Sequence, residues 1–295
     1  MDEIFGVPIQ AFMGQLMLGL VNGSFYALLS LGLAVIFGML NIVNFAHGAL
    51  YMVGAFFSWM LLNYHGVNYW ASLLIVPFAV GLIGVLIEKC LLQWLQGLDH
   101  LYGLLLTFGL ALIIEGIFRE AYGSSGQPYD LPQVFKGAFD LGFMFLPKYR
   151  AWVVVAAIVV CLATWFVIEK TKLGAYLRAG TENPNLVKAF GINVPLMVTL
   201  TYAFGVGLAG LAGVMAAPIY QVSPLMGSNI IIIVFAVVVI GGMGSILGSI
   251  VTGLALGLIE GLSKVFYAEI STTVVFIIMA VVLMVRPAGL FGREK

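Results

Sequence analysis

The chain has 295 residues, of which 62% are apolar and 9% are charged, and its formal net charge is zero. Soluble globular domains carry about 25% charged residues, so this composition excludes such a domain and indicates a protein solvated by lipid. The zero net charge also excludes a general attraction to nucleic acid.

Eight apolar runs follow one another along the chain, and each is expected to be helical. In hydrocarbon the backbone must satisfy its own hydrogen bonds, and no run alternates as a barrel strand does. The runs lie at about 11–38, 47–63, 68–88, 101–119, 150–168, 195–217, 229–263 and 268–285. The run at 229–263 exceeds one span and is interrupted by GGMGS. The sequence predicts one all-α domain, 1–295: a polytopic membrane helix bundle with eight or nine crossings and broken helices near 41–48 and 241–245.

The first irregular stretch, NIVNFAHG at 41–48, places polar side chains between two apolar runs. On a helix, Asn41, Asn44 and Gly48 fall on one face, with His47 beside them. Polar groups at membrane depth are costly and face a cavity or a neighbouring helix. Two interpretations stay open: these side chains bridge helices by hydrogen bonds, or they line the path of a substrate.

Basic residues near span ends predict the orientation, because cytoplasmic loops are enriched in Lys and Arg. The segment 169–194 and the residues after the last run are rich in them (Lys170, Lys172, Arg178, Lys188; Arg286, Arg293, Lys295). Both regions, and hence the C-terminus, are predicted to be cytoplasmic. The longest polar connection, 121–148, is predicted to be external, although Lys148 and Arg150 do not fit the rule there. Asp2 and Glu3 lie outside if the number of crossings is odd.

The segment 169–194 contains the signals of a short helix. Asn183 is a suitable N-cap, Pro184 suits the first helical position, and Gly191 suits the C′ position that ends the helix. The helix would have an apolar side with Lys188 opposite (Leu186, Val187, Phe190). So short a helix is unstable in water without a docking surface. It packs either on its own membrane domain or on a cytoplasmic partner, and the spacing favours neither.

The second irregular stretch contains Gly241, Gly242, Gly244 and Ser245. Its glycines either permit close packing of helices or bend the backbone toward a translocation route. AVIFGMLNIV at 34–43 resembles VVVIGGMGSI at 237–246, and paired interrupted helices are typical of transporter binding regions. Residues 41–48 and 241–245 are therefore the candidate substrate path.

No catalytic or metal site is expected. The chain has no GxxxxGK[ST] or HExxH motif, and Cys90 and Cys161 lack metal-binding spacing. Two i,i+4 pairs, Glu115/Arg119 and Glu260/Lys264, most simply neutralise each other near span ends. An energy source would have to come from another subunit.

Four segments, in this order, resemble the permease subunits of bacterial branched-chain amino acid ABC importers of the LivH type. They are GLAVIFGMLNIVNFAHGALYMVGAFF (32–57), TKLGAYLRAGTENPNLVKAFGINV (171–194), VVVIGGMGSILGSIVTGLALGLIE (237–260) and RPAGLFG (286–292). The similarity covers essentially the whole chain.

The resemblance implies that 169–194 is a cytoplasmic coupling loop that docks on an ATPase. Six residues match the family's docking segment: Gly174, Arg178, Glu182, Asn183, Pro184 and Gly191. Lys188, on the short helix predicted after Pro184, is counted with them as a coupling residue. Importers in general carry an EAA-type coupling loop that ends in Leu-Pro, and this chain lacks that ending after Ile192. The resemblance further implies a bacterial inner-membrane location, a second related permease, two ATPases that bind ATP, and a periplasmic binding protein that delivers Leu, Ile or Val. The permease itself would need no cofactor.

Other functions remain open at this point. A relative that carries urea, short amides or other amino acids would show similar motifs. A stand-alone solute channel would need no motor-docking helix, and an intramembrane hydrolase would need a serine near His47.

Overall fold

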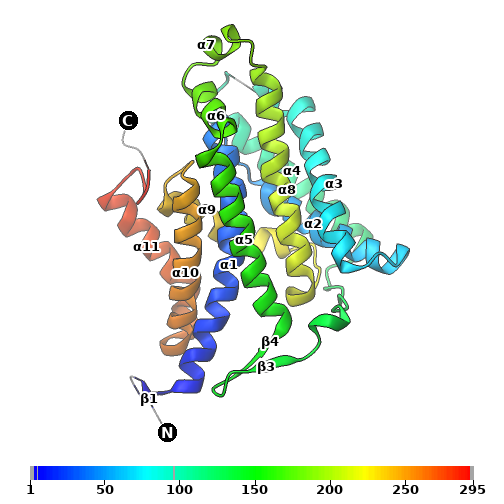
Figure 1. Cartoon of the computed structure of the whole chain (residues 1–295), viewed down its shortest axis with the longest axis vertical. Helices are drawn as coiled ribbons and strands as arrows, with labels where there is room; N and C mark the ends of the chain where they lie inside the picture. Colours follow the sequence, from blue (N-terminus) through cyan, green and yellow to red (C-terminus); the bar gives the residue numbers. More distant parts are fainter. Residues whose placement is uncertain (1–2, 5, 96, 293–295) are drawn as a thin grey trace. The chain divides into compact units, whose positions relative to one another are not determined.

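The structure is a computed structural model that describes residues 3–4, 6–95 and 97–292 (Figure 1). The charges expected at Asp2, Arg293 and Lys295 lie outside this range. Within it, seven helices are long and apolar enough to cross a membrane, and one shorter apolar helix spans Met226–Gly241. The all-α, polytopic membrane class is confirmed, while the number of eight or nine crossings stays a prediction.

The eleven α-helices of the described residues account for every predicted apolar run. They are α1 Ile9–Leu40, α2 Ala46–His65, α3 Tyr69–Cys90, α4 His100–Tyr122, α5 Lys148–Lys170, α6 Lys172–Glu182, α7 Pro184–Ala189, α8 Val194–Tyr220, α9 Met226–Gly241, α10 Ile246–Phe266 and α11 Ser271–Val285. Three 3₁₀ helices lie at Leu92–Leu95 (η1), Gln133–Phe135 (η2) and Ala268–Ile270 (η3). Helix breaks at 41–45 and 242–245 agree with the two predicted positions.

Two short antiparallel hairpins complete the described structure. Strands β1 (Glu3–Ile4) and β2 (Val7–Pro8) pair ahead of α1. Strands β3 (Ala138–Asp140) and β4 (Phe145–Pro147) pair with Phe139 opposite Leu146. The second hairpin occupies the connection that the sequence assigns to the external side.

The chain divides into two compact units, each made of separated segments. The first unit comprises residues 1–30, 131–162 and 233–295, and the second comprises 31–130 and 163–232. Three of the four boundaries fall inside α1, α5 and α9, and the fourth, at 130/131, lies in the connection between α4 and η2.

In the first unit, small residues bring the N-terminal half of α1 against α10. A Cβ on Gly253 would lie 2.5 Å from the backbone nitrogen of Ala27, and one on Gly23 would lie 3.0 Å from the carbonyl oxygen of Leu254. Gly257 faces the backbone of Gly23 at the same crossing. Close backbone approach through small residues is how membrane helices gain packing contacts where lipid removes the hydrophobic drive.

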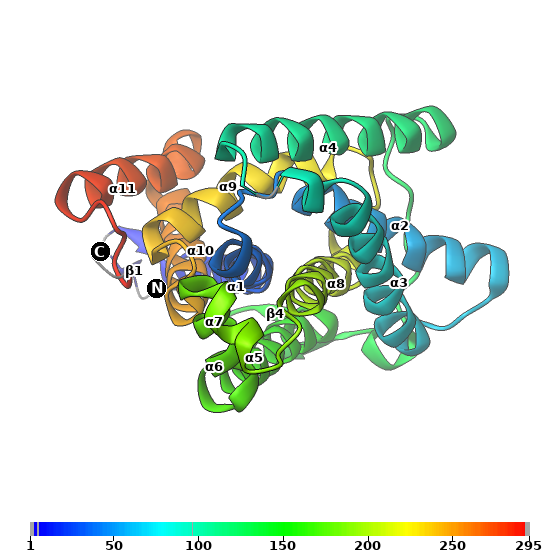
Figure 2. The ribbon, with the colours of Figure 1, turned by 90° about the horizontal axis from the view of Figure 1, so that it is seen from above.

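In the second unit, α8 packs against both α2 and α3, and Figure 2 shows the three helices side by side. A Cβ on Gly54 of α2 would lie 2.5 Å from the carbonyl oxygen of Gly210 in α8. A Cβ on Gly81 of α3 would lie 3.2 Å from that of Ala203. These helices bury Tyr51, Val80 and Tyr202 completely or nearly so.

Candidate functional site

The predicted short helix of the segment 169–194 is present as α7. Asn183 is its N-cap and accepts a hydrogen bond through Oδ1 from the amide of Leu186, at 3.0 Å. Pro184 is the first helical residue. Gly191 has φ +82°, a left-handed conformation that glycine adopts without strain, and its amide donates to the carbonyl of Lys188 at 2.9 Å. The local capping chemistry of the sequence is confirmed.

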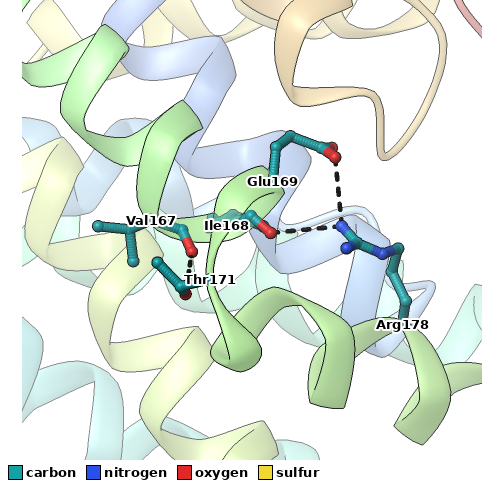
Figure 3. Close-up of polar contacts among 5 residues, drawn as sticks. All are labelled: Val167, Ile168, Glu169, Thr171 and Arg178. Atoms are coloured by element: carbon teal, nitrogen blue, oxygen red, sulfur yellow. Dashed lines mark hydrogen bonds and ion pairs between the residues drawn. The ribbon is translucent and has the colours of Figure 1, made fainter.

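A second helix of the segment, α6, was not predicted, and Arg178 holds it against the end of α5 (Figure 3). The guanidinium Nη1 donates to the carbonyl oxygen of Ile168 and pairs with the carboxylate of Glu169, each at 3.3 Å. Gly174 is buried, and a side chain there would collide with the same Ile168 carbonyl. Arg178 and Gly174 therefore form the tight turn from α5 into α6.

Helix α7 extends past the N-terminal end of α8 (Figure 1). Some of the apolar residues at this helix are buried against α8, and others are exposed. Val187 is buried and packs in a small cluster with Val194 and Val198 of α8. In contrast, 54% of the surface of Leu186 and 77% of that of Phe190 are exposed. Val187 is thus the buried apolar residue of this helix, while Leu186 and the C-cap residue Phe190 are exposed. Glu182 and Lys188 are exposed on the same segment.

At the first break, the expected common face of Asn41, Asn44 and Gly48 is wrong. Helix α1 ends at Leu40, and Asn41 takes a left-handed conformation with φ +52°, as Asn often does at a helix end. The turn rotates Asn41 to the surface, whereas Asn44 is buried. Gly48 lies in α2, where a Cβ would come within 2.7 Å of the Gly227 carbonyl oxygen.

Two predicted residues of the first break, Asn44 and His47, lie in a buried polar cluster of the second unit. The Asn44 amide donates through Nδ2 to the hydroxyl of Tyr202 at 3.1 Å. Its Oδ1 is buried and has no hydrogen-bond partner among the described residues. The amide of His47 donates to the backbone carbonyl of Asn44 at 3.2 Å, and its ring lies against Gly32.

Sequence reasoning missed two residues that hold this break, Thr107 and Tyr202. The Thr107 hydroxyl accepts from the amide of Phe45 and donates to the carbonyl of Val43, both at 3.2 Å. It replaces backbone hydrogen bonds that the interrupted helix cannot make. A signal was available for Thr107, since it is the lone hydroxyl between Leu104 and Ile114 in an apolar run.

The second break is closed by the C-terminal segment of the same unit. Gly241 ends α9, and Gly242 has φ +100°. The amides of Leu290 and Phe291 donate to the carbonyls of Ile240 (2.8 Å) and Gly241 (3.1 Å). They satisfy carbonyls that a helix end otherwise leaves without partners. Two of the segments singled out in the sequence, 237–260 and 286–292, are therefore in contact.

The remaining members of this break are turn and cap residues. Gly244 has φ +83°, and Ser245 caps α10 by accepting a hydrogen bond through Oγ from the amide of Gly248 at 3.1 Å. The break is thus a defined turn between α9 and α10, at the position where the sequence predicts an interruption.

Both expected charge pairs are present and each has a further partner. Lys264 donates to Glu260 at 2.6 Å, and the Tyr26 hydroxyl donates to the other oxygen of Glu260 at 2.6 Å. Arg119 pairs with Glu115, which also accepts a hydrogen bond from Ser228. The pairs therefore link helices: Glu260 joins α10 to α1 through Tyr26, and Glu115 joins α4 to α9 through Ser228.

A family model described as branched-chain amino acid transport system / permease component matches residues 15–284. The high-affinity branched-chain amino acid transport system permease protein LivH of Salmonella typhimurium is 29% identical over 303 residues, which cover 96% of each chain. BraD, the corresponding permease protein of Pseudomonas aeruginosa, is 29% identical over 302 residues, which cover 97% of this chain and 98% of BraD.

A more distant relative is LivM of Escherichia coli, a permease protein of the same kind of system. It is 26% identical over 296 residues, which cover 92% of this chain and 68% of LivM. No solved structure matches the chain. The family match spans most of the sequence and agrees with the membrane-spanning helices. This multi-pass membrane protein belongs to the family of branched-chain amino acid transport permeases.

Proposed function

We propose that this chain is the permease subunit of an ATP-driven importer that moves branched-chain amino acids, Leu, Ile or Val, across the inner membrane by alternating access. Membership of the permease family and the names of the relatives support this substrate class. The chain has no catalytic residue of its own in this account and needs no cofactor, because ATP binds to separate subunits.

The observation that carries the proposal is the outward apolar surface of α7. Leu186 of α7 and Phe190 at its C-cap are exposed outside the apolar spans, while Val187 packs the helix against α8. Burying one such side chain contributes about 1.5–3 kcal/mol, so a partner that covers both gains several kcal/mol. Helix α7 therefore inserts into a groove of an ATPase subunit. The turn formed by Gly174 and Arg178 presents it.

The rest of the coupling segment shapes and charges this surface. Asn183, Pro184 and Gly191 define the ends of α7, and Glu182, just before it, offers an exposed negative charge. Lys188 lies on the side of α7 that lines a cleft with α8. Closure of the ATPase pair would move α7 and shift the permease between two packings. In this account the segment 169–194 and the C-terminus are cytoplasmic, and the loop 121–148 is external.

The complete importer would contain two permeases, two ATPases and a periplasmic binding protein in addition to the lipid bilayer. A related second permease is supported by the similarity of this chain to both LivH and LivM. The two permease chains would enclose the translocation route together.

The two helix breaks are the proposed substrate path. Asn44, with an unsatisfied buried Oδ1, and His47 offer dipoles for a neutral zwitterion. Asn41 and Gly48 flank this break, and Gly241, Gly242, Gly244 and Ser245 form the other one.

Reconstitution tests the proposal. The complex of both permeases and both ATPases, placed in proteoliposomes with the binding protein outside, should accumulate labelled leucine only when ATP is present inside. Leucine entry that needs neither ATP nor the ATPases would instead identify a channel. Accumulation of urea or acetamide without leucine would assign a different substrate.

A further inference from the structure

A cleft of about 370 Å³ lies within the second unit, next to α7. Its walls come from the end of α1, residues 97–99 with the start of α4, the end of α6, α7 and the start of α8. Asp99 and Lys188 line it together with the polar side chains of His100, Thr181 and Asn185 and with apolar ones, among them Met39, Ile42, Leu98 and Val198. We propose that this cleft binds a zwitterionic α-amino acid with a branched apolar side chain.

The two charged side chains of the cleft are available to a ligand. No salt bridge of 4.0 Å or less joins Lys188 or Asp99 to any residue in the part of the chain that the structure describes. Asp99 uses one oxygen, Oδ1, to accept from the amide of Leu101 at 2.9 Å, as the N-cap of α4. An ammonium and a carboxylate that face one cleft without pairing complement a ligand that carries both charges.

The apolar wall and the size of the cleft narrow the ligand class further. Small-molecule sites occupy about 300–1,000 Å³ and combine apolar walls with a few placed polar groups. A cleft of 370 Å³ is at the small end of that range, which suits a single amino acid. A branched aliphatic side chain fits the apolar surfaces of the buried Ile42 and Val198 and of the half-exposed Leu98. A charged side chain would find no partner on these three surfaces.

Occupation of the cleft would act on α7, because Pro184 and Lys188 of that helix belong to its wall. A ligand that bridges α7 to the α4 N-terminus favours one position of α7 over others. If α7 transmits ATPase closure, the amino acid released into the cytoplasm slows its own import through this cleft. This regulatory role rests on the proposed function, while the binding itself does not.

Direct binding is the first test. Labelled L-leucine is equilibrated with the purified permease–ATPase complex in nanodiscs, without the binding protein. Asp99→Asn removes the charge but keeps an equally good N-cap, and Leu98→Trp fills the cleft. Each should weaken saturable binding at least about tenfold, since a charge-assisted contact or the wall is lost. The controls Asp130→Asn and Leu105→Trp, which change exposed residues elsewhere in the unit, should bind like the wild type.

Two analogues separate the roles of the charges. Leucinamide lacks the carboxylate that Lys188 would bind, and 4-methylpentanoate lacks the ammonium that Asp99 would bind. Each should compete at least about tenfold less well than leucine. Binding that is absent, or that is unchanged in both Asp99→Asn and Leu98→Trp, overturns the site.

Regulation is tested by loading proteoliposomes with unlabelled leucine before uptake of labelled leucine starts. Internal leucine should slow ATP-driven uptake in the wild type and in Asp130→Asn. The same inhibition of Asp99→Asn should need an internal leucine concentration about tenfold higher. Equal inhibition of all three, or none, overturns the regulatory role. If leucine binding depends on Asp99 but the complex shows no ATP-driven uptake, the binding site is supported and the proposed transport function is rejected.

Discussion

Arg178 and Glu169 join α6 to the end of α5 through an ion pair of 3.3 Å, and the same guanidinium group donates to the Ile168 carbonyl. The side chains of Arg178 and Glu169 are 43% and 42% exposed, so the pair itself contributes only about 0.2–1 kcal/mol to stability. Its main effect is therefore positional: it orients α6, and α7 follows directly.

Arg178→Ala should accordingly leave the melting temperature of the purified complex nearly unchanged but reduce ATP hydrolysis stimulated by the loaded binding protein. Lys172→Ala, which removes an exposed cation from the same helix, serves as the control and should keep the stimulation. A large loss of thermal stability in Arg178→Ala, with stimulation intact, would contradict the positional role.

Gly257→Ala tests the α1–α10 crossing. An added Cβ would overlap the backbone of Gly23, and overpacking of this kind costs about 1–3 kcal/mol. We expect a lower melting temperature in detergent. Gly116→Ala is the matched control, because nothing lies within 4 Å of a Cβ there and alanine favours the helix. Equal stability of the two variants would mean that the helices do not approach so closely.

Tyr202→Phe tests the buried cluster at the first break. The change leaves the Asn44 amide without its hydroxyl partner, and a buried unsatisfied group costs about 1–3 kcal/mol. The variant should melt earlier than the wild type, while Tyr102→Phe, at an exposed position, should not. In a double-mutant cycle with Asn44→Ala, the losses should be smaller in combination than their sum. Strict additivity would show that the two side chains do not interact.

Removal of the residues after Arg286 tests the closure of the second break. The Ile240 and Gly241 carbonyls would lose the amides of Leu290 and Phe291, so the end of α9 should fray. Hydrogen exchange of amides near 239–245 should then become faster, while that of α8 stays unchanged. Unaltered exchange at 239–245 would show that the C-terminal segment does not hold the break.

The sequence predicted the helix caps and helix breaks, because these features depend on residues that are close together in the chain. Asn183, Pro184 and Gly191 define α7 because capping and left-handed turns involve residues only a few positions apart. The helix breaks were likewise visible from polar and glycine residues inside apolar runs.

Tertiary contacts decided the features that the sequence did not predict. The face expected for Asn41 assumed a continuous helix, but α1 ends one residue earlier. Tyr202 is 158 positions from its partner Asn44, so no local pattern joins them. Helix α6 was missed because Gly174 and Gly180 lower its helix propensity, while Arg178 holds it from α5.

The central claim is that α7 docks on an ATPase through its exposed apolar side chains. Phe190→Ala removes the most exposed of them, and Phe78→Ala removes an aromatic ring of similar exposure, 79% against 77%, from the middle of α3. The most direct measurement is ATP hydrolysis by the reconstituted complex, with and without the leucine-loaded binding protein. The account predicts that Phe190→Ala loses most of the stimulation and that Phe78→Ala keeps it. Full stimulation in Phe190→Ala, in a complex that retains its ATPases, would contradict it.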